Sequence, residues 1–144
     1  MSTSPLSVTR PLALELIDAA GSATAVHADL TYDACDPYAV TAGFSITPPA
    51  ESAGTTVRWV FARSLLITGV NEPAGEGDVR IWPCLNTQGQ AVTVIELLSP
   101  EGEAVLQART DQVCEFLRES ELLVPSGGEG SYVDIDDTIA KLLE

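Results

Sequence analysis

Residues 26–33 read Val-His-Ala-Asp-Leu-Thr-Tyr-Asp, a strict alternation of apolar and polar side chains. Successive side chains of a β-strand point to opposite faces, so this stretch predicts a strand with one buried face and one solvated face. Residues 38–46 repeat the pattern, with Tyr38, Val40, Ala42, Phe44 and Ile46 on one side. We therefore expect two half-buried antiparallel strands joined by a turn at residues 36–37.

The alternation continues on both sides of this pair. Leucines at positions 12, 14 and 16 predict an earlier strand, and Val57 with Trp59 predict a fourth, with turns at residues 21–22 and 48–49. The spacing of Phe61, Leu65 and Leu66 then predicts a short helix over residues 61–68. We expect Gly69 to end that helix in a left-handed conformation.

The second half of the chain repeats this order. A flexible connector rich in Pro and Gly at residues 73–78 precedes strands predicted at 79–85, 91–98 and 103–108. Residues 99–102 predict a hairpin turn, because Pro100 presets φ and Gly102 accepts a positive one. Val113, Phe116 and Leu117 predict a helix. Residues 125–131 are expected to form a flexible linker before a C-terminal helix whose apolar stripe is Ile135, Ile139, Leu142 and Leu143.

These elements predict one α+β domain over residues 1–144. The order of strands, helix, strands, helix and helix indicates two related sheet-plus-helix units. No helix separates consecutive strands within a unit, so we expect two antiparallel β-sheets with helices rather than a parallel sheet.

Composition narrows the classes of function. The formal net charge is −14, which opposes binding to phosphate backbones and anionic lipid at long range. The three cysteines form no C-x-x-C pair, and with a single histidine the chain lacks zinc-ligand spacing. The first residues lack the basic and apolar segments of a signal peptide, so a cytoplasmic location with reduced thiols is expected.

Three local features resemble chemical sites, and each has a simpler interpretation. His27 lies two residues from Asp29, but no nucleophile accompanies the pair, so a solvated histidine is expected. Cys35 is interpreted as a small packing residue, because neighbouring acids raise a thiol pKa. The carboxylates at 134, 136 and 137 lack the spacing of a calcium loop and suit the start of a helix. We therefore predict no catalytic, cofactor-binding or metal-binding residues, and no enzyme activity.

Aromatic and basic side chains interleave in one part of the sequence. The residues are Trp59, Phe61 and Trp82 with Arg58, Arg63 and Arg80. Stacking aromatics with nearby cations is how many proteins bind single strands, so a single-stranded nucleic-acid-binding module is the alternative function. The acidic total makes nucleic acid an unfavourable partner.

Four separated motifs follow one another along the chain: residues 36–40 (Asp-Pro-Tyr-Ala-Val), 57–63 (Val-Arg-Trp-Val-Phe-Ala-Arg), 77–83 (Gly-Asp-Val-Arg-Ile-Trp-Pro) and 99–104 (Ser-Pro-Glu-Gly-Glu-Ala). Together they closely resemble the SsgA-like proteins, sporulation-specific cell division regulators of actinobacteria. The motifs match in order and spacing from about residue 12 to residue 143, and the SsgB type of the family is the most similar.

The resemblance implies a non-enzymatic regulator of sporulation-specific septation. It implies recruitment of the tubulin-like GTPase FtsZ to division sites together with an SsgA-type family member, so that any membrane association is indirect. It also implies a whirly-like fold, a homotrimer and concentration at division septa.

The motif residues themselves are interpreted as scaffold rather than chemistry. Trp59, Phe61 and Trp82 are expected in packing, Gly77 and Gly102 in turns, and Pro37 ordering Tyr38. Partner binding is assigned to the C-terminal stripe of Ile135, Ile139, Leu142 and Leu143, an amphipathic surface that a partner could cover.

Overall fold

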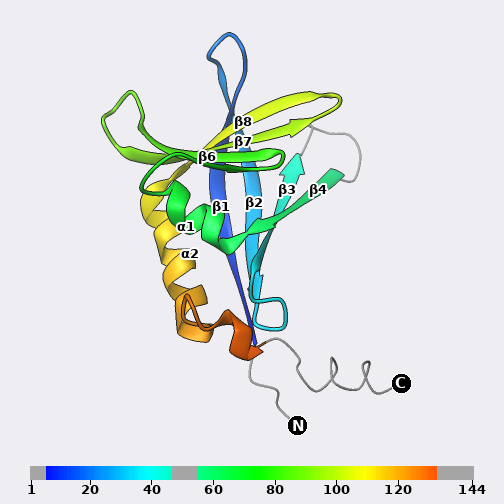
Figure 1. Ribbon diagram of the computed structural model, residues 1–144. Coiled ribbons are helices and arrows are strands. Elements are labelled where there is room, and N and C mark those ends of the chain that lie inside the picture. Colours follow the sequence, from blue (N-terminus) through cyan, green and yellow to red (C-terminus); the bar gives the residue numbers. More distant parts are fainter. Residues whose placement is uncertain (1–5, 47–54, 133–144) are drawn as a thin grey trace.

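The computed structural model describes residues 6–46 and 55–132. Its first half is a meander of four long strands that leads directly into a short helix (Figure 1). These elements are β1 (Ser7–Ile17), β2 (Ala23–Asp33), β3 (Ala39–Ile46), β4 (Thr55–Ala62) and α1 (Arg63–Gly69).

The second half has the same plan, four strands followed by a helix. It consists of β5 (Ala74–Glu76), β6 (Val79–Leu85), β7 (Ala91–Ser99), β8 (Gly102–Arg109) and α2 (Thr110–Leu123), followed by the 3-10 helix η1 (Glu129–Tyr132). The α+β class and the antiparallel pairing predicted from the sequence are confirmed.

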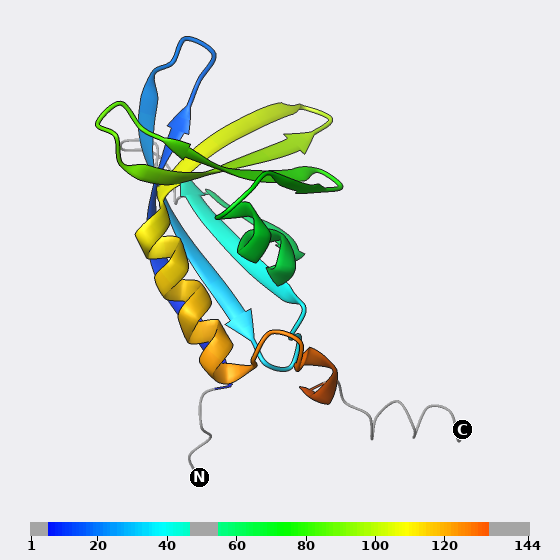
Figure 2. The ribbon, with the colours of Figure 1, turned by 60° about the vertical axis from the view of Figure 1, so that its left-hand side comes forward.

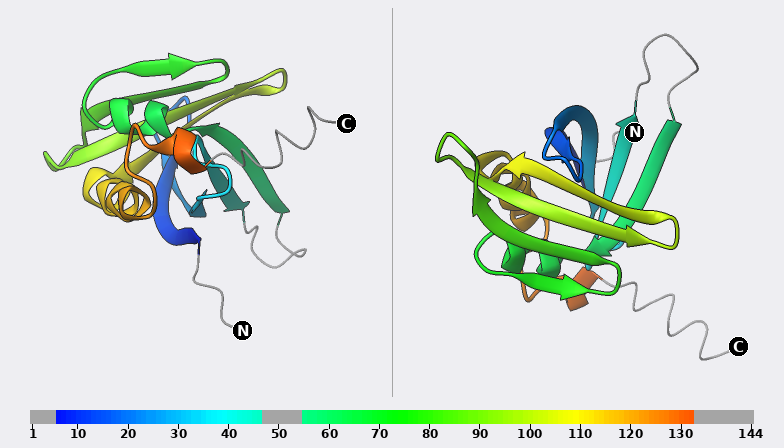
Figure 3. Two further views of the ribbon diagram at one scale, coloured as in Figure 1. Left: turned by 60° about the horizontal axis from the view of Figure 1, so that its bottom comes forward. Right: turned by 90° about the horizontal axis from the view of Figure 1, so that it is seen from above.

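The two-sheet prediction is wrong in one respect, because the halves form one hydrogen-bonded sheet. The strand order is β4-β3-β2-β1-β8-β7-β6-β5. Among the described residues, the halves are joined by one strand pairing, in which the last four residues of β1 pair antiparallel with β8, from Leu14 opposite Ala108 to Ile17 opposite Val105. Because this join is short, the halves diverge and cross at a steep angle (Figure 1 and Figure 3). Alternation within each strand could not reveal a pairing between the first strand and the last.

One hydrophobic core lies between the two halves of the sheet and the helices. The apolar face predicted for residues 26–33 is buried, with Leu30 and Tyr32 at most 1% exposed. Helix α1 lies between the halves of the sheet, and α2 runs beside β1 (Figure 2). The core also takes in Val113 and Phe116 of α2, both fully buried.

Helix α1 differs from its prediction at both ends. Strand β4 continues to Ala62, so Phe61 is a buried strand residue rather than the start of the helix. Gly69 is the last residue of the helix, and it is not one of the described glycines with a positive φ. Its role is close packing, because a Cβ at Gly69 would lie 2.4 Å from Cγ2 of Ile81 on β6. Glycine here allows the helix to approach the strand.

Two turn regions complete the comparison. The predicted connector at residues 73–78 contains an edge strand, because β5 pairs with β6 through a turn in which Gly77 has φ of 61°. Gly102 has φ of 143° in the β7–β8 turn, a conformation available to glycine. The packing role expected for Cys35 is wrong, since the side chain is exposed and Ala34 takes the buried position.

Candidate functional site

Arg63 is the most deeply buried charged residue of the described chain, with 1% of its surface exposed. It is the first residue of α1 and follows β4 directly. Its N–H donates to the carbonyl of Tyr38 at 2.8 Å, which continues the β3–β4 pairing by one residue. Arg63 therefore has the inward orientation of Trp59 and Phe61 and carries its charge into the interior.

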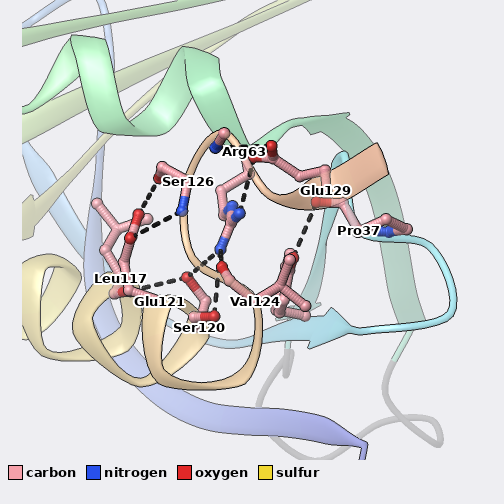
Figure 4. A network of polar contacts seen from close by, with 10 residues as sticks. Pro37, Arg63, Leu117, Ser120, Glu121, Val124, Ser126 and Glu129 are labelled. Atoms are coloured by element: carbon pink, nitrogen blue, oxygen red, sulfur yellow. Dashed lines mark hydrogen bonds and ion pairs between the residues drawn. The ribbon is translucent and has the colours of Figure 1, made fainter. Parts of the chain in front are cut away.

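The guanidinium of Arg63 caps the C-terminal end of α2 (Figure 4). Its Nη1 donates to the carbonyl oxygens of Ser120, at 3.2 Å, and Val124, at 2.8 Å, and to Ser120 Oγ at 3.2 Å. The last carbonyls of a helix lack partners within the helix and carry partial negative charge. The last turn of α2 has no basic side chain of its own, so a residue from another helix supplies the charge.

Glu129 completes the charge balance at this position. Nη2 of Arg63 donates to the Glu129 carboxylate at 2.8 Å, and the other carboxylate oxygen accepts the N–H of Gly127 at 2.8 Å. The hydrogen bond from Arg63 is the main cause that lowers the pKa of Glu129 below its ordinary value. This ion pair attaches η1 to the start of α1.

The segment between α2 and η1 has its own hydrogen bonds. Ser126 donates both its backbone N–H and its hydroxyl to the Glu121 carboxylate, and the hydroxyl is the main cause that lowers the pKa of Glu121. Gly128 donates its N–H to the carbonyl of Pro125 at 2.8 Å. Residues 125–131, expected as a flexible linker, form a hydrogen-bonded turn and most of η1.

The aromatic ring of Tyr32 closes the other side of the cluster. The guanidinium carbon of Arg63 lies 4.5 Å from the ring centroid, a distance that allows a cation–π interaction. The Tyr32 hydroxyl donates to the carbonyl of Pro37 at 2.9 Å. We call Tyr32, Arg63, Ser120, Val124 and Glu129 the Arg63 anchor. It joins β2, α1, α2 and η1, and it suits fixed positioning of the segment that leads toward residue 133.

The anchor was not identified from the sequence, although a signal was present. Val57, Trp59 and Phe61 share one strand face, and Arg63 is the next residue of the same parity. A charged residue at an inward position requires a partner of opposite charge. That partner, Glu129, lies 66 residues further along the chain, so spacing alone could not identify it.

The predicted scaffold residues occupy different parts of the fold. Pro37 is buried and Tyr38 is 56% exposed in the β2–β3 turn, close to the anchor. Phe61 is buried, and Trp59 and Trp82 are half-buried. The partner-binding residues proposed from the sequence, Ile135, Ile139, Leu142 and Leu143, lie outside the described residues, as do the carboxylates at 134, 136 and 137 and the turn at 48–49.

The structure separates the basic and aromatic residues of the alternative function. Arg63 is buried in the anchor, and Arg58 is exposed on the outward face of β4. Arg80, on β6, has its Nη1 3.8 Å from Oε1 of Glu96 on β7. Alternation places Trp59 on the face opposite Arg58. These side chains do not form one continuous basic surface.

The remaining candidates lie apart from one another. His27 and Asp29 are exposed on the solvated face of β2, as expected. Within residues 6–46 and 55–132, no group of three His, Cys, Asp or Glu side chains could hold a metal ion. In the same part of the chain, no helix is long and apolar enough to span a membrane.

Comparison with known proteins identifies the family. The family model described as "Streptomyces sporulation and cell division protein, SsgA" matches residues 26–129, which include most of β2, strands β3 to β8, helices α1 and α2 and the whole Arg63 anchor. The chain belongs to the SsgA family. The sporulation-specific cell division protein SsgB of Streptomyces coelicolor is 42% identical over 137 residues, which cover 95% of this chain and 96% of that protein.

Other members of the SsgA family are similar to this chain in both sequence and structure. SsgB of Thermobifida fusca is 40% identical over 143 residues, covering 99% of both chains. The crystal structure of an SsgA-like sporulation-specific cell division protein from T. fusca has a TM-score of 0.82 and covers 98% of both chains. A solved structure from work on SsgB of S. coelicolor has a TM-score of 0.80 and 43% identity, covering 92% of this chain and 99% of its own.

Proposed function

We propose that the protein is a non-enzymatic regulator of sporulation-specific cell division that helps to recruit FtsZ to septum sites through protein–protein contact. One observation carries the proposal: identity of about 40% over nearly the full length to relatives named sporulation-specific cell division proteins. The match extends through both halves of the sheet and both helices, so it concerns the whole architecture rather than one motif.

The proposed docking surface for FtsZ is the apolar stripe of Ile135, Ile139, Leu142 and Leu143. The Arg63 anchor supports this assignment, because it fixes η1 to α1 and α2 just before the stripe begins. A short amphipathic segment that starts from a fixed point loses less entropy on binding than one on a free tether.

The same proposal includes an SsgA-type family member as a second partner, concentration at division septa and a homotrimer. The chain mass is 15.2 kDa, so light scattering at micromolar concentration is expected to give three times this value. A monomer mass throughout a dilution series would contradict the trimer without affecting the assignment to cell division.

The test of recruitment uses purified proteins. FtsZ polymers are sedimented with GTP in the presence of the full chain, and co-sedimentation above the level without FtsZ is expected. In sporulating cells that lack their own SsgB, the chain fused to a fluorescent protein is expected at septa and to restore septation. Failure in both experiments would reject the function.

Nucleic-acid binding of whirly type, the fold type expected from the resemblance, is the alternative that these experiments must separate. The structure gives it little support, since Arg63 is buried and Arg58 and Arg80 lie on different strands. Fluorescence anisotropy with a labelled single strand at physiological salt is expected to show no submicromolar binding. Tight binding with a steep salt dependence would reverse the order of the two functions.

A further inference from the structure

Strand β4 forms one edge of the sheet, and no described strand pairs with its outer side. The pairing of β4 with β3 determines which backbone groups of β4 point to the free edge. Arg63 donates to Tyr38, and the pairs Phe61–Val40 and Trp59–Ala42 follow at two-residue steps. Directly opposed residues alternate between hydrogen-bonded and non-hydrogen-bonded pairs in an antiparallel ladder. The N–H and C=O groups of Thr56, Arg58 and Val60 therefore point away from β3, to the free edge.

This edge has little of the protection that exposed strands usually carry. Val60 is 61% exposed and Val57 is 39% exposed, and Arg58 is the only charged residue in β4. The strand has eight residues and no proline. Proteins usually protect such edges with several charges, proline, a bulge or a covering segment.

An apolar hollow of about 140 Å³ lies beside the inner face of β4. Its lining comes from both halves of the sheet: Leu16, Val26, Phe44, Val57, Trp59, Leu97, Ala104 and Leu106. An engineered apolar cavity of about 150 Å³ binds benzene, so this volume suits one leucine or phenylalanine side chain. In Figure 1 the end of the β7–β8 hairpin lies above the start of β4.

The surroundings of the hollow are acidic. A second hollow shares Leu16 and Ala104 with the first and is also lined by Asp18 and Glu103. Glu101 lies in the β7–β8 turn and Glu103 at the start of β8, and both side chains are exposed without an ion pair among the described residues. The whole chain has a formal net charge of −14. A partner with basic side chains next to its apolar anchor would complement this surface.

We propose that the free edge of β4 and the adjoining apolar hollow form a docking site for an extended peptide segment of a partner protein. The segment adds as a ninth strand to the eight-stranded sheet, hydrogen bonding to the backbone of Thr56, Arg58 and Val60. Side chains of an added strand alternate between faces, so one apolar residue enters the hollow. Basic residues two positions from this anchor share its face and lie toward the acidic β7–β8 hairpin that carries Glu101 and Glu103. The site contains none of the four stripe residues and does not depend on FtsZ being a partner.

The decisive variant is Val60→Pro. Proline removes an N–H that points to the free edge and leaves the hydrogen bonds to β3 in place, a substitution that edge strands tolerate. Val60→Ala is the matched control, because it shortens the same side chain and keeps the N–H. Ala104→Leu provides an independent test by filling the hollow from its lining. Circular dichroism melting of all three variants tests whether the fold is retained.

The probe is a random linear peptide library displayed on phage and selected on the full chain, with selected peptides then synthesised and measured by fluorescence anisotropy. We expect enriched peptides with an apolar residue beside lysine or arginine. Val60→Pro and Ala104→Leu are expected to weaken binding about tenfold or more, and Val60→Ala less than about threefold, since backbone hydrogen bonds and one pocket provide the affinity in this mode. Replacing the apolar residue of the peptide with alanine should have the same effect as Ala104→Leu.

Three results would overturn the proposal. Absence of enriched peptides, or equal binding to Val60→Pro, would show that the edge is not a peptide site. A dimer in light scattering that Val60→Pro converts to a monomer would assign the edge to a second copy through antiparallel β4–β4 pairing, which has two-fold symmetry. Enrichment only after deletion of residues 133–144 would assign the edge to the C-terminal segment of the chain itself. FtsZ sedimentation with Val60→Pro is measured separately, so recruitment and peptide docking can fail independently.

Discussion

Nη1 of Arg63 lies 2.8 Å from the carbonyl oxygen of Val124, although the two residues are 61 positions apart in the sequence. This hydrogen bond connects the first residue of α1 to the residue that follows α2. Both helices follow directly from a strand, and this hydrogen bond joins the start of α1 to the C-terminal end of α2 (Figure 4). The Arg63 anchor therefore connects the two halves of the chain at a place distant in sequence from the short β1–β8 pairing.

The substitution Arg63→Met is expected to lower the free energy of unfolding by about 3 kcal/mol, because it removes one partner of a buried ion pair. The carbonyls of Ser120 and Val124 lose a charged donor, and Glu129 loses its ion-pair partner. Urea denaturation at neutral pH measures the change. Arg58→Met, at an exposed position on β4, is the matched control and is expected to change stability by less than about 0.5 kcal/mol. Equal effects of the two substitutions would show that the anchor contributes no stability.

Acid should weaken the anchor through Glu129. The pKa of this carboxyl is lowered in the folded chain, mainly by its hydrogen bond from Arg63, so the unfolded chain binds more protons near pH 4.5. Stability from Glu129 is therefore complete above the ordinary glutamate pKa of about 4.3 and is lost as pH falls through the lower folded value. Because relief of the −14 charge acts in the opposite direction, the quantity to measure is the difference between wild type and Glu129→Gln.

This difference in free energy of unfolding is expected to be positive at about pH 6 and to shrink as pH falls below the ordinary glutamate pKa of about 4.3. Glutamine keeps one oxygen that can accept from Arg63, so the variant removes the charge and the second acceptor oxygen, which binds the N–H of Gly127, and can retain the hydrogen bond from Arg63. The control variant is Glu103→Gln, which lies outside the anchor and should show no such convergence. A difference that stays constant across this pH range would contradict the assigned role of the Glu129 charge.

The sequence predicted local structure better than long-range structure. Alternation at residues 26–33 and 38–46 predicted the strands and their buried faces, because period two is a property of each strand alone. The β1–β8 join, the contact of Gly69 with Ile81 and the Arg63–Glu129 pair all unite residues distant in sequence. No spacing rule relates such positions, so the single sheet and the anchor became evident only from the structure.

The contact between α1 and β6 gives a direct test of packing at Gly69. An alanine Cβ would lie 2.4 Å from Ile81 Cγ2, so Gly69→Ala is expected to destabilise the fold by about 1–3 kcal/mol through overpacking, despite the better helix propensity of alanine. Gly43→Ala is the control, because its nearest neighbour would be 3.9 Å away. Thermal and urea unfolding measure both. Stabilisation by Gly69→Ala would show that α1 can move away from Ile81 without loss.

The last prediction concerns the C-terminal stripe. Replacing Ile135, Ile139, Leu142 and Leu143 with serine leaves the chain length and charge unchanged and removes the apolar surface proposed to bind FtsZ. We expect co-sedimentation with FtsZ polymers to be lost while the melting temperature stays within about 2 °C of wild type, since the anchor lies before the stripe in the sequence. The matched control is Leu122→Ser on α2, which removes another apolar side chain, 81% exposed, and should preserve co-sedimentation.

The combination of the two readouts decides between a partner-facing and a core-facing stripe. A fall in melting temperature of many degrees would mean that the stripe packs on its own domain, because large losses of stability follow from removal of buried apolar side chains. Unchanged melting with unchanged co-sedimentation would remove the stripe from the interface. In that case the same assay with Val60→Pro would decide whether FtsZ uses the free edge of β4 instead, because that substitution alters the edge and leaves residues 133–144 unchanged.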